Sequence, residues 1–351
     1  MKKLICIFSL IFLLSSCVHE FPYLEDANVT VDVDFDIDVD LGIELDMPLY
    51  MEDVFQSRAN ATTEEYNYYI RYIVKAFPQK KNGDFYTKPS HTWVESKEAF
   101  DEMDHKLNVT LPEGTYKFMC WADYTHENPT HDHFFSPDES FLVIKENTEY
   151  IGNNDRRRCW RGSTVIDVVR RGSHVEPVSG TVEMGMAIAR YSVEATDLDD
   201  FKLKAAAFKM EQTGTKVNPE DIDIEDYVAV FYYTGFKPNA YNLHTDRPCD
   251  SNTGYRFKSP IMKMEDNDDD PTNDKAFLGF DYCFANGTET TVNLAIGIED
   301  KDGNEISLIK GINVRLQRGK RTIMRGRFMT QESYGGVSIN PDFDGEFNII
   351  I

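Results

Sequence analysis

The sequence lacks the short motifs that identify the common enzyme classes. It contains no GxSxG nucleophile elbow, no phosphate-binding P-loop, no HExxH zinc motif and no dinucleotide-binding glycine fingerprint. Carboxylates are too abundant to single out a glycosidase pair, since Asp and Glu account for 60 of the 351 residues. We therefore expect a protein that is not an enzyme and that needs no cofactor.

Basic residues and long apolar runs are also scarce. The chain has 37 Lys and Arg against 60 Asp and Glu, and its formal net charge is −23. Such a charge repels nucleic acid and anionic lipid, so we expect no nucleic-acid partner. After Leu14 no apolar run approaches the roughly 18 residues of a transmembrane helix.

Cysteine pairs at metal-binding spacing are missing as well. The chain has no CxxC, and the four cysteines beyond the first 17 residues are widely spaced: Cys120, Cys159, Cys249 and Cys283. A zinc knuckle is therefore disfavoured. Two interpretations stay open, namely one disulfide in each half of the chain, or free thiols that act as small apolar side chains.

Two other segments contain metal-ligand residue types without a complete pattern. His126, His131, Asp132 and His133 lie in one loop, which does not by itself bring three or four ligands together. The acidic segment 265–270 resembles a calcium loop, but Pro271 replaces the required glycine and Phe277 the required glutamate. We predict no metal site.

The first residues present are typical of a lipoprotein signal peptide. Lys2 and Lys3 precede an apolar run that ends in Leu14-Ser15-Ser16-Cys17. In such a signal the cysteine becomes the first mature residue and carries the lipid, such as palmitate. We expect a signal over 1–16, a lipid on Cys17, a tether over 17–27 and a position outside the cytoplasm. An ordinary secretory signal with a chance cysteine is the alternative.

A long alternating pattern follows the tether. From Val29 to Met47 apolar residues occupy every second position, and most of the residues between them are acidic. A period of two is typical of a half-buried β-strand. Because the run would extend roughly 60 Å, we expect a bend near Gly42.

The rest of the chain predicts short strands separated by turn residues. Tyr66–Phe77, Leu107–Leu111 and Thr115–Ala122 are rich in aromatic and branched residues. We expect an all-β fold with one sandwich over 28–195 and a second over 196–351, joined by a hinge at 196–200. Residues 201–210 are predicted to be a strand, and 96–107 are the one convincing helix candidate.

The basic residues concentrate in one cluster, which comprises Arg156, Arg157, Arg158 and Arg161. It could receive an acidic partner or a sugar. In an acidic chain, however, such a cluster more often forms local salt bridges, and we favour that interpretation.

Several segments resemble the fimbrillin-associated lipoproteins of Bacteroidetes. In the first half these are Tyr69–Val74, Leu111–Tyr116 and Trp121–Asp123. In the second half they are Val230–Asn242, Asp250–Gly254, Leu278–Tyr282, Arg318–Gly326 and Gly335–Ile351. The resemblance implies two tandem transthyretin-like β-sandwich domains. It also implies an outer-membrane lipid anchor at the cell surface and a role as anchor, accessory or tip subunit of a fimbria.

Members of that family join one another by β-strand addition, so other fimbrial subunits are the expected partners. The candidate residues for strand addition here are Val31, Val33, Phe35, Ile37, Val39, Ile349, Ile350 and Ile351. The alternative, which we favour, is that they are internal strands of their own domains. Polymerising members are cut after an arginine, and the first Lys or Arg after Cys17 is Arg58. A cut there would remove the alternating strand, so we expect an uncut anchor or accessory subunit.

Two other functions remain open. A surface glycan-binding lipoprotein of a nutrient-uptake system would also be tethered and β-rich, but it would display tryptophans for stacking on sugars. This chain has only Trp93, Trp121 and Trp160, and Trp121 lies in a strand pattern predicted to be core. A free-standing structural lipoprotein is the third possibility.

Overall fold

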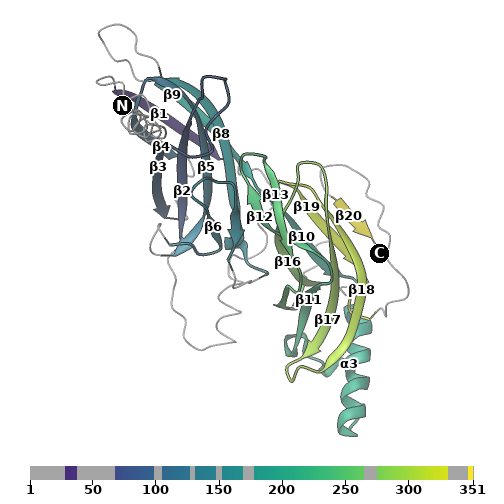
Figure 1. Ribbon diagram of the computed structural model, residues 1–351. Helices are drawn as coiled ribbons and strands as arrows, with labels where there is room; N and C mark the ends of the chain where they lie inside the picture. The colour runs from purple at the N-terminus through teal and green to yellow at the C-terminus, as the bar shows by residue number, and fades with distance from the viewer. Residues whose placement is uncertain are drawn as a thin grey trace, which may run out of the picture.

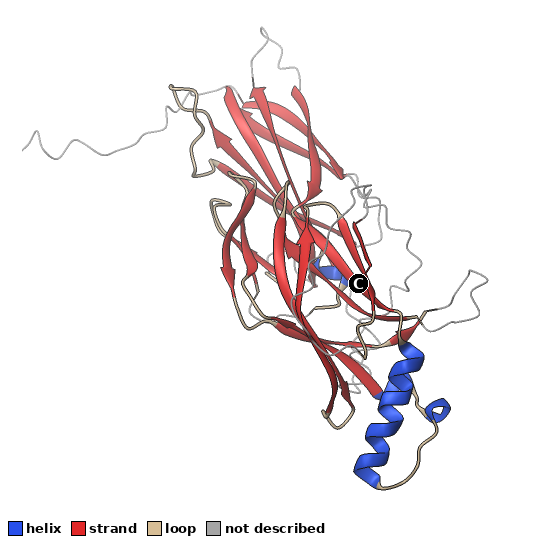
Figure 2. Ribbon diagram, turned by 90° about the vertical axis from the view of Figure 1, so that its right-hand side faces the viewer, coloured by secondary structure: helices blue, strands red, loops and turns tan. Residues whose placement is uncertain are grey.

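The computed structural model describes residues 28–37, 68–98, 105–126, 131–147, 152–168, 178–264, 275–330 and 347–350. Within these ranges the strands form four sheets, and α3 (Leu198–Thr213) is the one α-helix (Figures 1 and 2). The β-rich fold predicted from the sequence is confirmed. In the described part of the chain, no helix has the length and apolar character needed to cross a membrane.

The first sheet has seven strands in the order β3-β2-β5-β8-β9-β1-β4. Their bounds are β1 (Asn28–Ile37), β2 (Tyr68–Pro78), β3 (His91–Glu98), β4 (His105–Pro112), β5 (Gly114–His126), β8 (Cys159–Val168) and β9 (Val178–Met186). Strand β9 pairs with β1 up to Met184, and its last two residues pair with β8. Buried side chains of β4 and β9 share one hydrophobic cluster with those of β2, β5 and β8. The sheet therefore folds over a common core.

The contact between β8 and β9 depends on a glycine. A Cβ atom at Gly162 of β8 would lie 2.4 Å from the carbonyl oxygen of Glu183 on β9. Since real Cβ atoms do not approach a backbone oxygen so closely, only glycine permits this packing.

A smaller sheet combines strands from distant parts of the sequence. Its order is β13-β12-β7-β6, with β6 (Phe135–Pro137), β7 (Ile144–Glu146), β12 (Lys237–Asn242) and β13 (Arg247–Asn252). Ala240 and Tyr241 of β12 pair with Lys145 and Ile144 of β7. This antiparallel sheet also packs on the first sheet, where Phe135 lies edge-on to Trp121 of β5 with 5.6 Å between ring centroids.

The two remaining sheets enclose a second core. One has the order β15-β16-β10-β19-β20, with β10 (Ile188–Ala195), β15 (Met262–Lys263), β16 (Ala276–Phe284), β19 (Arg321–Gly326) and β20 (Phe347–Ile350). The other has the order β14-β11-β17-β18, with β11 (Tyr227–Tyr233), β14 (Arg256–Pro260), β17 (Thr290–Asp300) and β18 (Glu305–Leu316). The described residues also include the 3-10 turns η1 (Asp155–Arg157), η2 (Pro219–Asp221) and η3 (Ile224–Asp226).

The predicted strand over 201–210 is wrong, because these residues belong to α3. Two acidic residues, Asp199 and Asp200, occupy the first turn, where they interact favourably with the helix dipole. The alanines at 205–207 have high helix propensity. Gly214 ends the helix in a left-handed conformation with φ 69°, and its N–H donates to the Met210 carbonyl.

The predicted helix over 96–107 is also wrong at both ends, which belong to β3 and β4, and residues 99–104 lie outside the described part. Buried Leu107, Val109 and Leu111 alternate with more exposed neighbours, and β4 pairs with β1 throughout. Long-range pairing therefore overrides the helical spacing of three apolar residues.

Strand β10 lies in a different part of the fold from the one expected. We predicted that it closes the first sandwich, but it pairs antiparallel with β16 and parallel with β19. Its inward residues Ala189, Tyr191 and Val193 belong to the second core. The division at 195/196 stays a prediction. Below, the described residues up to Met186 are called the N-terminal half, and those from Ile188 the C-terminal half.

Candidate functional site

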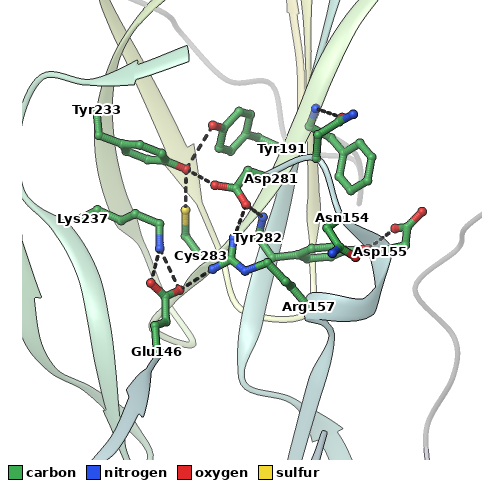
Figure 3. Close-up of polar contacts among 12 residues, drawn as sticks. Glu146, Asn154, Asp155, Arg157, Tyr191, Tyr233, Lys237, Asp281, Tyr282 and Cys283 are labelled. Atoms are coloured by element: carbon green, nitrogen blue, oxygen red, sulfur yellow. Dashed lines mark hydrogen bonds and ion pairs between the residues drawn. The ribbon is translucent and has the colours of Figure 1, made fainter. Parts of the chain in front are cut away.

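Four charged side chains meet in the protein interior where the two halves touch (Figure 3). Glu146 ends β7 and Arg157 ends η1, whereas Lys237 begins β12 and Asp281 lies within β16. Their side chains are at most 4% exposed. We call these four residues the charge cluster.

The charge cluster forms a continuous chain of ion pairs. Lys237 Nζ lies 2.6 Å from Glu146 Oε2, and Arg157 Nη2 lies 2.8 Å from Glu146 Oε1. The other arm of the same guanidinium, Nη1, lies 2.6 Å from Asp281 Oδ1. Each buried charge thus has an opposite charge within hydrogen-bonding distance, which the interior requires.

The η1 turn brings Arg157 to this position. The Asn154 side chain caps the turn by accepting from the Arg156 amide at 2.8 Å. Beside it, Asn153 has φ 57° and exchanges two hydrogen bonds with the Phe280 backbone, at 3.0 and 3.1 Å. The turn is thereby fixed to β16, one residue from Asp281.

Tyrosine hydroxyls extend the cluster into the second core. Tyr233 donates to Asp281 Oδ2 at 2.6 Å and lies 3.0 Å from the Tyr191 hydroxyl and 3.3 Å from Cys283 Sγ. Burial raises the pKa of Asp281 and of both tyrosines, lowers the pKa of Lys237, and raises the pKa of Cys283 to about 12. A thiol with such a pKa is a poor nucleophile at neutral pH. The geometry is suited to holding the halves together.

A second ion network joins the halves nearer the surface. The Asp246 carboxylate forms ion pairs with Arg161 of β8, at 2.6 Å from Nε, and with Arg318, at 2.8 Å from Nη2, and it accepts a hydrogen bond from the Tyr241 hydroxyl at 2.8 Å. The aspartate lies in the β12–β13 turn with φ 54°, a conformation that aspartate tolerates better than most residues. One carboxylate therefore connects an arginine from each half.

The predicted arginine cluster forms salt bridges within the protein at two of its members, and their partners Asp281 and Asp246 lie far away in the sequence. Arg157 and Arg161 form the ion pairs described above. Arg158 donates to the Tyr124 hydroxyl at 3.1 Å, and Arg156 lies over the Tyr68 ring at 4.7 Å. These contacts agree with the interpretation we favoured.

The strand-addition candidates lie at two separate places. Val31, Val33, Phe35 and Ile37 are in β1, whose backbone pairs with β4 on one side and β9 on the other. Ile349 and Ile350 are in β20, at the end of its sheet, where it pairs with β19. Cys17, Val39 and Ile351 lie outside the described residues, as do the acidic segment 265–270 and the expected bend near Gly42.

The four cysteines are free thiols. Cys120, Cys159 and Cys283 are completely buried, and Cys249 is exposed on β13. The free-thiol alternative therefore describes this structure, although not every thiol is buried.

The histidine loop is fixed by contacts with the first sheet. Asp132 pairs with buried Arg71 at 2.8 Å, and the His131 carbonyl accepts from Thr125 at 2.9 Å. His133 packs edge-on against Phe134. Within the described ranges, no group of three or more His, Cys, Asp or Glu side chains is arranged to hold a metal ion.

Sequence reasoning did not single out Glu146, Lys237 or Asp281 as site residues. A signal existed for Asp281, which is a lone charge in an otherwise uncharged strand, Ala276–Phe284, that is buried throughout. Glu146 and Lys237 have no comparable signal, because each lies in a short strand among polar residues and their partnership spans 91 positions.

The structure is that of a predominantly β protein whose two halves are joined by buried ion pairs. The chain belongs to the family of unknown function DUF6562, whose model matches residues 27–351. No curated protein matches it.

The solved structures that match this chain include three fimbrial proteins. The fimbrial anchor protein Mfa2 from Porphyromonas gingivalis is 11% identical, with a TM-score of 0.38, over 80% of this chain and 81% of that one. A fimbrial assembly protein from Parabacteroides distasonis is 10% identical, with a TM-score of 0.36, over 87% and 93%. The tip fimbrial protein Mfa3 from Porphyromonas gingivalis is 10% identical, with a TM-score of 0.33, over 82% and 81%.

Proposed function

We propose that this protein is a non-enzymatic surface lipoprotein. It is anchored to the outer membrane through Cys17 and serves as anchor, accessory or tip subunit of a fimbria, joined to its partners by β-strand addition. The sequence supports this proposal through the lipoprotein signal, the acidic alternating strand and the segments that resemble fimbrillin-associated lipoproteins.

The observation that carries the proposal is the position of β1. This strand follows the lipid-bearing cysteine closely in sequence, and it pairs with β4 over Asn28–Phe35 and with β9 over Val31–Ile37. A lipid on Cys17 would therefore be connected to an inner strand of the seven-stranded sheet. Pull on the tether would act along backbone hydrogen bonds on both sides of β1, which suits an anchor.

The location of the first basic residue agrees with an uncut subunit. Arg58 follows β1 in the sequence, so a cut after it would remove β1 together with the lipid. The edges of β4 and β9 would then lose their shared neighbour. An unpaired strand edge is prone to aggregation or to capture of another strand. Retaining β1 keeps both the membrane connection and the complete sheet.

The C-terminal strand supplies a place for strand addition. In the five-stranded order β20 is terminal, and its described pairing is with β19. A partner's strand could extend the sheet beyond β20 or take its place beside β19. Ile349 and Ile350 are the described residues that such a partner would meet or displace.

The test is to isolate the full-length lipidated protein from native membranes after cross-linking and to identify what accompanies it. We expect fimbrial subunits, linked through peptides near β20, and a mature N-terminus at Cys17. Mature protein beginning at Ala59 would contradict the uncut anchor. Isolation without any fimbrial subunit would contradict the fimbrial role.

The positions of the tryptophans give little support to the glycan-binding alternative. Trp121 and Trp160 are completely buried, so they cannot stack on a sugar. Trp93 is partly buried and lies between the His91 and Phe118 rings. Specific binding of the full chain on a glycan array, lost on Trp93→Ala, would favour this alternative.

A further inference from the structure

The backbone passes between the two halves only once. Strand β9 ends at Met186 and β10 begins at Ile188, so Ala187 is the sole covalent link. Relative motion is the default expectation for two units of one chain unless their interface is large and hydrophobic. Apolar contacts do cross this junction, since Tyr241 and Phe284 of the C-terminal half belong to the first core. What fixes the relative orientation of the halves is therefore a question of non-covalent contacts.

The charge cluster lies across this junction in a reciprocal arrangement. The N-terminal half contributes one acid and one base, Glu146 and Arg157, and the C-terminal half contributes Asp281 and Lys237. Both cross-junction pairs are 2.6 Å long. The β7–β12 pairing, at Ile144–Tyr241 and Lys145–Ala240, lies directly beside them.

Buried charges restrict the orientation of the halves because each charge needs its opposite charge nearby. An apolar surface that slides by a few ångströms loses part of its packing, but the same displacement here would leave Lys237 or Asp281 without its opposite charge in the interior. An uncompensated buried charge is among the most unfavourable arrangements in a protein. Only orientations close to the observed one pair all four charges.

We propose that Glu146, Arg157, Lys237 and Asp281 act as an alignment lock that holds the two halves in one relative orientation. The lock has a conformational role in addition to any contribution to stability, and it does not depend on the fimbrial function. In a tethered protein it would keep β20 at a fixed position relative to β1.

The experiment measures the distance between spin labels in full-length protein that carries Cys249→Ser, because Cys249 is the exposed thiol among the described cysteines. Labels are placed on cysteines introduced at Asn82 and Asp302, which are exposed, one in each half. A locked protein gives one narrow distance distribution. The variant Glu146→Gln, Arg157→Met, Lys237→Met, Asp281→Asn removes all four charges at similar volume and is expected to broaden the distribution about twofold.

The matched control removes an exposed ion pair within the C-terminal half, through Asp200→Asn and Arg327→Met, whose side chains are each 52% exposed. It should leave the distribution unchanged. A neutral cluster variant that folds and still gives the narrow distribution overturns the proposal, because apolar packing alone would then set the orientation.

If the neutral variant does not fold, hydrogen exchange of the unaltered protein tests whether the two halves separate. The lock predicts that amides in the β7–β12 pairing exchange as slowly as those in the centre of β5, because the halves do not separate. Exchange more than about a hundredfold faster at β7–β12, with β5 still protected, would show independent opening and overturn the lock.

Discussion

Arg71 of β2 and Asp123 of β5 form a two-armed ion pair across neighbouring strands. Arg71 Nε donates to Oδ1 at 2.8 Å and Nη2 donates to Oδ2 at 2.7 Å, and the two side chains are 2% and 0% exposed. The same guanidinium pairs with Asp132 at 2.8 Å. One arginine thus connects the sheet to the loop that leads into β6.

The first prediction concerns this pair. Asp123→Ala should lower the free energy of unfolding by about 3–5 kcal/mol, because it leaves the Arg71 charge poorly compensated in the interior. Chemical denaturation measures the loss. As a control, Arg327→Ala breaks an exposed pair and should cost less than about 1 kcal/mol. Equal effects of the two substitutions would contradict the importance of burial.

Lys75 should make stability depend on alkaline pH. Its ammonium donates to the carbonyls of Asp138 and Glu139 and lies 3.9 Å from the centroid of the Phe141 ring. Burial lowers its pKa from 10.5 to about 8. Between these values the unfolded chain binds more protons than the folded protein, so this group's contribution to stability rises with pH.

The comparison of urea unfolding between pH 7.5 and 10 tests this prediction. Lys75→Met should reduce the rise in stability that is expected of the unaltered protein. Lys88→Met, at an exposed position, serves as the control and should preserve it. A rise of the same size in Lys75→Met would show that other groups cause it.

Gly162→Ala should destabilise the protein through the β8–β9 contact. The added Cβ meets the Glu183 carbonyl at 2.4 Å, and overpacking of this kind costs about 1–3 kcal/mol. Gly185→Ala is the matched control, since its Cβ would meet only the end of the Arg161 side chain at 3.2 Å. Thermal unfolding should separate the two, and a smaller effect at Gly162 would contradict the close approach.

The cysteines should differ in reactivity toward a thiol reagent. In the folded protein Cys249 should react, whereas Cys120, Cys159 and Cys283 should react only after unfolding, because they are completely buried. Burial raises the pKa of all three thiols, which slows them further. Mass spectrometry of the labelled protein gives the count. A missing pair of thiols after denaturation would reveal a disulfide.

Cys17→Ser should abolish lipid attachment. We expect the variant to lose incorporation of labelled palmitate and to leave the membrane fraction, because the lipid is the proposed anchor. Val18→Ala is a suitable control. Membrane retention of Cys17→Ser without lipid would mean that another contact holds the protein there.

The strands with strong local patterns were predictable. A strand was predicted over Tyr66–Phe77, and β2 occupies Tyr68–Pro78. The strand predicted over Ile188–Ala195 is β10. In both segments aromatic and branched residues favour extended structure. The strand predicted over residues 201–210 was wrong, because apolar and polar residues alternate over only part of this segment. The acids of the first turn and Gly214 at the end favour a helix instead.

The charge cluster could not be predicted in the same way. Glu146 and Lys237 are ordinary polar residues in the sequence, and nothing local shows that each will be buried beside the other. Asp281, inside an apolar strand, was the one visible signal. A partnership across 91 or 124 positions depends on how sheets meet, which local patterns do not encode.

Three properties follow from the amino-acid sequence alone: the β-rich character, the net negative charge and the expected lipid anchor at Cys17. These follow from composition and short periodic patterns, which act through local backbone preferences and hydration. Only the tertiary structure decided that β1 lies between β4 and β9, that β10 joins the second core, and that four charges meet at the junction of the halves. Those outcomes depend on pairing between distant segments, where burial and charge compensation select one arrangement.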